Sequence, residues 1–224
     1  MSSNEGSESA LVMSYLELRV AIGILGIALP LVLLLGALII FQTGPQSSIS
    51  SYYYTGMRDV LVGTLVTFGA FLFSYKGSPG DAKFGKIACV SAIGVALFPT
   101  TPYGKTTDAA RTIGFFHLVF TTVFFATLIY FSYFLFTKSN QDPLPPKKRQ
   151  RNLVYRICGV LMAICILGIV LVFFLPGAAA WLGGYAVFWL EAAAIWAFGV
   201  SWFIKGEALK LLNDPVAPEE GAEA

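Results

Sequence analysis

Three ionisable side chains in apolar stretches of the chain, Asp59, His117 and Glu191, are of the types that could do chemistry. One histidine and two carboxylates can hold a divalent metal ion with open coordination positions. The same groups can act as an acid and a base, one giving a proton and the other taking it. They match no local motif such as HxxxH or HExxH, so the sequence assigns neither a metal site nor a catalytic site.

Two further roles for these polar residues remain open. In a structural clasp, Glu191 is neutral or paired with an arginine, and His117 bonds a backbone carbonyl or a serine; such contacts between membrane helices contribute about 0.6 kcal/mol on average. In a transporter, Glu191 couples transport to proton movement, because acids near the midplane serve that purpose. The chain has only one deep acid and no evident inverted repeat, which argues against the transporter.

The elements that must position these residues belong to a chain too apolar to be soluble. Hydrophobic residues make up 56% of its 224 positions and charged residues 12%, against about 45–50% and about 25% in soluble domains. The apolar runs are roughly 17–25 residues long, which is the length one helix needs to cross a bilayer. We expect spans near Val20–Phe41, Arg58–Tyr75, Phe84–Pro99, Ile113–Thr137, Leu153–Leu175 and Leu182–Ile204.

The predicted fold class is all-α. Backbone polar groups in lipid must be satisfied within helices or a closed barrel, and unbroken apolar runs without period-two alternation exclude the barrel. The sequence therefore predicts a polytopic integral membrane protein, a six-transmembrane-helix bundle over residues 18–206. A flexible N-terminal segment, 1–17, and an acidic, disordered tail, 207–224, are expected to flank it.

Lysine and arginine are distributed unevenly between the two predicted sides of the membrane. Cytoplasmic loops carry the excess of these residues, so both termini are expected in the cytoplasm, with the protein in a bacterial inner (plasma) membrane. A net charge of +2 gives no reason to expect a nucleic-acid partner. The cytoplasmic group comprises Arg19, Lys76, Lys83, Lys86, Lys138, Lys147, Lys148, Arg149, Arg151, Arg156, Lys205 and Lys210, and the opposite group comprises Arg58, Lys105 and Arg111.

The depth of the polar residues points to the outer half of the membrane. At 1.5 Å per residue, Glu191 lies about 13 Å below the outer end of the last span and His117 about 9 Å below Arg111. Arg58 and Asp59 begin the second span at its outer edge. We therefore expect these four groups to share one pocket.

Helical spacing predicts which faces turn toward neighbouring helices. Small and polar residues recur at helical intervals on three spans, and small residues let helices approach closely. The three predicted inward stripes are Asp59, Gly63, Thr67, Ala70 and Ser74; Gly114, His117, Thr121 and Phe124; and Glu191, Ala194, Phe198 and Ser201.

Three motifs carry a family resemblance: SSISSYYYTGMRDVLVGTLVTFGAFLFSYKG, AIGVALFPTTP and FWLEAAAIWAFGVSWFIKG. Together they resemble a group of small bacterial six-helix membrane proteins of unknown function. The chain is more distantly similar to the DRAM-type family, which includes autophagy modulators and GPI-anchor lipid remodelling factors. That resemblance implies a six-helix bundle whose outward cavity handles lipid, with Ser50, Tyr53, Arg58 and Asp59 at the matching positions. Glu191 has no counterpart in the DRAM-type pattern.

We interpret the chain as a protein that binds or organises membrane lipids or a membrane-protein partner, and we favour this over catalysis. No cofactor is expected. The alternatives are a lipid-modifying enzyme that uses Asp59, His117 and Glu191, and a proton-coupled transporter that works through Glu191. The candidate ligand-binding residues are Ser50, Tyr53, Arg58, Asp59, His117 and Glu191.

Overall fold

The computed structural model describes residues 2–75, 81–175 and 184–213, and in these ranges it is helical with no strand. The fold class is therefore all-α, as predicted. Short elements complete it: the 3-10 helices η1 (Ser50–Tyr54) and η3 (Lys210–Leu212), and a π-helical turn, Phe131–Leu135, that continues α4. The six longer helices are α1 (Ser2–Ile39), α2 (Arg58–Phe73), α3 (Ala82–Leu97), α4 (Asp108–Tyr130), α5 (Pro146–Phe174) and α7 (Ala186–Lys205).

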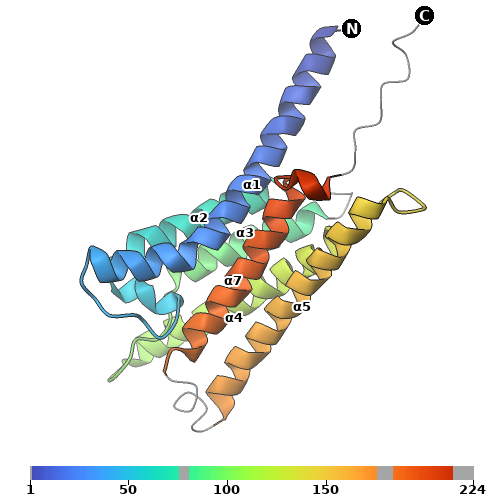
Figure 1. Cartoon of the computed structure of the whole chain (residues 1–224). Coiled ribbons are helices and arrows are strands. Elements are labelled where there is room, and N and C mark those ends of the chain that lie inside the picture. Colours follow the sequence, from blue (N-terminus) through green and yellow to red (C-terminus); the bar gives the residue numbers. More distant parts are fainter. Residues whose placement is uncertain (1, 76–80, 176–183, 214–224) are drawn as a thin grey trace, which may run out of the picture.

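The helices form two layers of three. Helix α7 packs between α1 and α5, and α3 packs between α2 and α4. Figure 1 shows the first layer in front and the second behind it. The layers also meet at their edges, where α1 contacts α2 and α4 contacts α5. Residues far apart in the sequence therefore face one another across the space between the layers.

Among the described residues, four helices, not six, are long and apolar enough to cross a membrane. They cover Tyr15–Ile39, Asp108–Leu135, Pro146–Phe174 and Ala186–Lys205. Helices α2 and α3 have 16 residues each, or about 24 Å, which is less than the ~30 Å hydrocarbon core. Helix α3 stops early because Phe98 precedes a proline and takes the extended backbone that this position favours.

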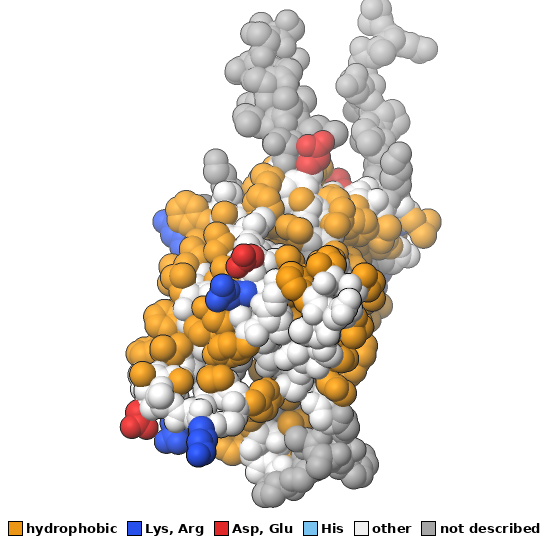
Figure 2. Space-filling model, turned by 90° about the vertical axis from the view of Figure 1, so that its left-hand side faces the viewer, with side chains coloured by type: hydrophobic (Ala, Val, Ile, Leu, Met, Phe, Trp, Pro, Cys, Tyr) orange, Lys and Arg blue, Asp and Glu red, His pale blue; other side chains and the backbone are white. Residues whose placement is uncertain are grey.

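The surface of the bundle is strongly apolar. Large hydrophobic side chains are exposed along α5, including Leu153, Ile157, Ile164 and Leu167, where a soluble helix would carry polar groups. On the face shown in Figure 2, hydrophobic side chains cover much of the described surface and charged groups are few. Such a surface is suited to lipid contact.

The ends of the chain differ from the predicted division. Helix α1 already begins at Ser2, so it covers most of the segment 1–17 that was expected to be flexible. This segment contains no proline, so nothing in it forces the helix to end. At the other end, Arg151 Nη1 donates to the carbonyl oxygen of Leu212 at 2.5 Å, which holds the start of the predicted tail against α5. Residues 214–224 lie outside the described ranges.

One end of the bundle is packed around an aromatic cluster, formed by Tyr75, Phe131, Phe136, Tyr155 and Trp202. Ring centroids lie 4.7 Å apart for Tyr75 and Phe131, and 5.1 Å apart for Phe136 and Trp202. Because α2, α4, α5 and α7 all end or begin near it, this cluster fastens the two layers together. Such aromatic pairs each contribute about 0.5–1.5 kcal/mol beyond burial.

Helices α1 and α7 approach almost to backbone contact. A Cβ atom added at Gly199 would lie 2.8 Å from the carbonyl oxygen of Gly23 and from the amide nitrogen of Ile27. Trp196 Nε1 also donates to the carbonyl oxygen of Ile27 at 3.0 Å. The glycines are therefore required by the distance between the two helices.

We expect Gly199→Ala to lower the free energy of unfolding in detergent by about 1–3 kcal/mol, because the added methyl group forces α1 and α7 apart. Gly63→Ala is the matched control, since a Cβ there meets nothing within 4 Å. Thermal unfolding monitored by size-exclusion chromatography checks both variants. Equal melting temperatures would contradict the close approach.

Candidate functional site

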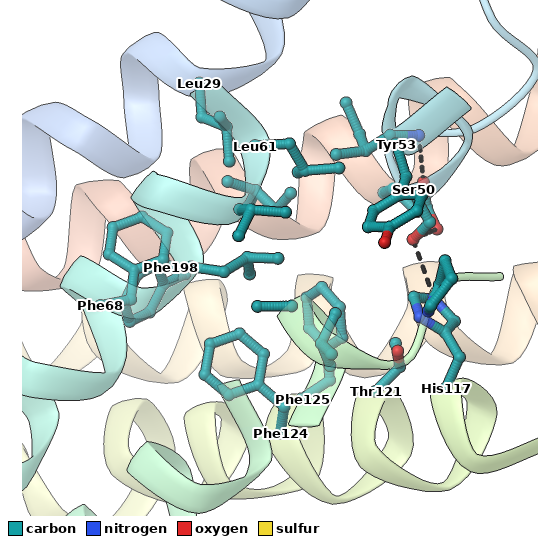
Figure 3. A pocket seen from close by; sticks show the side chains of 18 of the residues that line it. Leu29, Ser50, Tyr53, Leu61, Phe68, His117, Thr121, Phe124, Phe125 and Phe198 are labelled. Atoms are coloured by element: carbon teal, nitrogen blue, oxygen red, sulfur yellow. Dashed lines mark hydrogen bonds between the residues drawn. The ribbon is translucent and has the colours of Figure 1, made fainter. Parts of the chain in front are cut away.

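A cavity of about 50 Å³ lies between the two layers. Toward one end, the cavity wall carries Ser50, Tyr53, His117, Thr121 and Glu191. In Figure 3, Ser50, Tyr53, His117 and Thr121 lie toward one side of the cavity, and Phe68 and Phe198 lie at the other. The rest of its lining is mainly apolar: Leu29, Ile49, Leu61, Val62, Leu65, Phe68, Val95, Ala96, Pro99, Phe124, Phe125, Leu128, Ile195 and Phe198. The cavity therefore changes from polar to apolar along its length.

Ser50 bridges His117 and Glu191 at the polar end. His117 Nε2 lies 3.1 Å from Ser50 Oγ, and Ser50 Oγ lies 3.5 Å from Glu191 Oε1. The other oxygen of Glu191 accepts a hydrogen bond from the Ile49 amide at 2.5 Å, and His117 Nδ1 lies 2.7 Å from the Phe98 carbonyl oxygen. We call these contacts the cross-layer relay, because they run from α7 through η1 to α4 and the end of α3.

The contact with Phe98 fixes the protons in the cross-layer relay. A carbonyl oxygen can only accept, so His117 Nδ1 carries a proton and donates it to this bond. In the neutral imidazole, Nε2 then carries no proton, and its lone pair faces the Ser50 hydroxyl. If the ring is instead protonated at both nitrogens, Nε2 donates to Ser50, and Ser50 donates to an ionised Glu191. Because Ser50 has only one proton, the first arrangement also requires a protonated Glu191, whose carboxyl then donates to Ser50.

Two prolines explain why the Phe98 carbonyl is free to bond His117. In a continuing helix, the carbonyl of residue 98 would accept from the amide of residue 102, but residue 102 is proline and has no N–H. Pro99 likewise removes the amide that would bond the carbonyl of Val95. The FPTTP sequence therefore ends α3 and leaves an acceptor at the cavity wall.

Helix η1 is held in place from several directions, and this positions Ser50. The amide of Phe188, near the start of α7, donates to the carbonyl oxygen of Ser47 at 2.9 Å. Tyr54 donates through its hydroxyl to the carbonyl oxygen of Thr100 at 2.6 Å, which joins η1 to the segment after α3. The ring of Tyr52 is fully buried. These contacts fix η1, and with it the position of the Ser50 hydroxyl.

Asp59 and Arg58 do not share this site, although the sequence predicted that they would. The side chain of Asp59 is 96% exposed and that of Arg58 is 58% exposed, and the two lie 3.7 Å apart. Neither lines the cavity. The Arg58 guanidinium lies 5.7 Å from the ring of Tyr53, which does line it, so Arg58 is a neighbour of the site and Asp59 faces away.

The predicted inward stripe on α2 is wrong, whereas those on α4 and α7 run along buried faces for most of their length. On α2 the buried face carries Leu61, Leu65, Phe68 and Leu72 instead. The hydroxyls on the outward stripe bond to their own helix: Thr67 Oγ1, for example, donates to the Gly63 carbonyl at 2.7 Å. Since this satisfies the hydroxyl without a neighbour, the larger apolar side chains fill the interior.

Thr121 is an exception among the threonines of the helices. Thr122 and Thr127 of the same helix, like Thr64 and Thr67 of α2, donate to the carbonyl four residues earlier. The hydroxyl oxygen of Thr121 is buried and has no hydrogen-bond partner among the described residues. It is therefore a donor available at the polar end of the cavity. Sequence spacing placed Thr121 beside His117 but gave no sign of this difference.

Comparisons with known proteins identified no relative of this chain. No family model matches the chain, and neither a curated protein nor a solved structure matches it. The resemblance to the DRAM-type family therefore stays a prediction. Within the described ranges, no three His, Cys, Asp or Glu side chains are grouped to hold a metal ion.

We expect Glu191→Leu to lower the free energy of unfolding by about 1–3 kcal/mol, because it leaves the buried Ile49 amide unpaired. Glu191→Gln keeps an oxygen that can accept from that amide, so its loss should be smaller. Asp59→Asn, at an exposed position, is the control and should leave stability unchanged. Chemical or thermal unfolding in detergent measures all three, and an effect of Asp59→Asn as large as that of Glu191→Leu would contradict this site.

Proposed function

We propose that the protein is an integral membrane protein that binds an amphipathic lipid in the cavity between its layers. The observation that carries this proposal is the change in the cavity lining from the Ser50–His117–Glu191 end to the apolar remainder. A lipid has the same change along its length, from a hydrogen-bonding head or ester group to a hydrocarbon chain. Pockets of this kind use a few polar groups to orient a ligand that apolar surface retains.

The size of the cavity limits how the lipid is held. A volume of about 50 Å³ accommodates only a short part of an acyl chain, so a longer chain requires the layers to separate. At the aromatic cluster such separation would break close ring contacts. Near the cavity the layers are joined by the cross-layer relay, and hydrogen bonds can re-form with a ligand. The cavity end is therefore where a lipid would enter.

We further propose that all six long helices lie within the membrane, with both termini in the cytoplasm. The support is that basic side chains such as Arg19, Lys138 and Arg151 belong to the bundle end with the aromatic cluster, and that Lys105 and Arg111 lie at the other. The short helices α2 and α3 pack against longer neighbours, which can shield their ends. The cavity then opens in the outer half of the bilayer, where outer-leaflet lipid is available.

The orientation predicts different access to two engineered cysteines. In a variant with Cys89, Cys158 and Cys165 changed to alanine, Lys105→Cys should react with a membrane-impermeant maleimide in intact cells. Ser139→Cys should react only after the cells are permeabilised, because position 139 is expected on the cytoplasmic side. Labelling measured by gel shift, with the cysteine-free variant as blank, checks this. The reverse pattern would invert the orientation.

Filling the apolar part of the cavity should displace lipid. We expect Ala96→Phe to reduce the affinity for a fluorescent fatty acid at least about tenfold, or about 1.4 kcal/mol, because Ala96 is buried in the cavity wall. Val90→Phe adds the same ring on the outer face of α3, where Val90 is 63% exposed, and should bind as the unchanged protein does. Fluorescence titration in detergent gives both affinities, and melting temperatures show that the variants are folded. If Ala96→Phe binds the fatty acid as tightly as the unchanged protein does, the lipid is bound outside this cavity.

A further inference from the structure

We propose that Ser50 is a nucleophile and His117 its general base, and that together they cleave an acyl ester of the lipid bound in the cavity. This inference rests on the proposed lipid binding and assigns a reaction to the same cavity. Nucleophilic serines are recognised by a base within hydrogen-bond reach and by a third group that orients that base. Each of these parts is present among the described residues.

The first part is the contact between the nucleophile and its base. Ser50 Oγ lies 3.1 Å from His117 Nε2, within the reach that a general base requires. The Ser50 hydroxyl has one proton and two possible acceptors. The hydrogen bond from Ser50 Oγ to Glu191 Oε1 is longer, at 3.5 Å, and therefore weaker. The shorter contact directs the Ser50 proton toward the imidazole.

The second part is the group that orients the base. His117 Nδ1 donates to the Phe98 carbonyl at 2.7 Å, and this leaves Nε2 free to take a proton from Ser50. His117 is 8% exposed, so water does not compete strongly for its ring nitrogens. The backbone carbonyl of Phe98 occupies the position that a carboxylate occupies in serine hydrolases. It holds the ring without adding a negative charge.

The third part is a donor for the negative charge that develops on the ester oxygen. The Thr121 hydroxyl lines the same cavity, lacks a partner among the described residues, and lies beside His117 in Figure 3. Its proton is not used by its own helix. Donors left free in advance stabilise a transition state without first breaking another bond. Glu191 is a positioning residue, because it holds the Ile49 amide next to Ser50.

The cavity lining indicates the class of substrate. An acyl chain in the apolar part, against Leu65, Phe68 and Phe198, would place its carbonyl carbon at the polar end beside Ser50. Fatty acyl esters of glycerol or of another membrane alcohol have this form. An ester with a short acyl group would leave the apolar part unfilled and would be bound less tightly.

The reaction balances with water as the second substrate. Ser50 Oγ attacks the carbonyl carbon while His117 Nε2 takes the hydroxyl proton, and the carbonyl electron pair moves to oxygen. The intermediate collapses, the carbon–oxygen bond to the alcohol breaks, and His117 gives its proton to the departing alcohol. Water then attacks the acyl-serine, loses a proton to His117, and releases the fatty acid as Ser50 Oγ recovers that proton. Nothing is oxidised or reduced.

The test is covalent labelling of the purified full chain in detergent with hexadecyl fluorophosphonate. We expect one adduct, located by peptide mass spectrometry at Ser50 and absent from Ser50→Ala. Labelling of His117→Ala should be about 100-fold slower or more, the usual contribution of a general base. Ser51→Ala is the matched control: Ser51 bonds Ser48 at 2.6 Å and does not line the cavity, so its rate should be unchanged.

Further readouts separate catalysis from a structural role. Release of fatty acid from an ester lipid in detergent should stop in Ser50→Ala while fluorescent fatty-acid binding persists. No adduct at Ser50 in a folded protein that binds fatty acid would overturn this inference and leave the proposed function in place. Equal labelling of His117→Ala would also overturn it. If the unchanged protein neither binds fatty acid nor reacts with the fluorophosphonate, the proposed function and this inference are both rejected.

Discussion

In a bilayer core, a polar group has no water to bond and must find its partner within the protein. Several hydroxyl side chains of the described helices do so locally, as Thr67 and Ser74 do by bonding the preceding turn of α2. Glu191 and His117 have no such local solution. They are satisfied only across the two layers, through the Ser50 hydroxyl, the Ile49 amide and the Phe98 carbonyl. The need to pair these two side chains therefore determines where η1 and the end of α3 must lie.

The two ends of the bundle are joined by different kinds of interaction. Around Trp202, large rings fill the space between the layers, and Ser132 Oγ adds a hydrogen bond of 2.9 Å to the carbonyl of Tyr155. At the other end the layers enclose a cavity and meet through the cross-layer relay. Tight aromatic packing resists separation, whereas hydrogen bonds can be exchanged for those of a ligand. The fold thus concentrates its rigidity away from its candidate site.

Sequence reasoning recovered the class of fold and part of the site. Long apolar runs indicated the helices, and His117 and Glu191, which were expected to share one pocket, both line the cavity. The inward direction of Asp59 was wrong, because the spacing of small residues does not distinguish a helix contact from a hydroxyl bonded to its own turn. The span predicted for α2 ended two residues too late, and the one predicted for α3 began and ended two residues too late, because hydropathy does not register where a proline or a tight turn ends a helix. The relay itself could not be predicted, since two of its members are backbone groups.

The prolines after α3 have a consequence for the His117 ring. Pro99 holds Phe98 in the extended backbone that ends α3, and Pro102 offers no amide, so neither competes with the His117 ring for the Phe98 carbonyl. Without Pro99, α3 could continue and turn that carbonyl along the helix axis, away from His117. The ring would then lose the bond that selects which nitrogen carries its proton. The tautomer of His117 therefore depends on a proline eighteen positions earlier that carries no ionisable group.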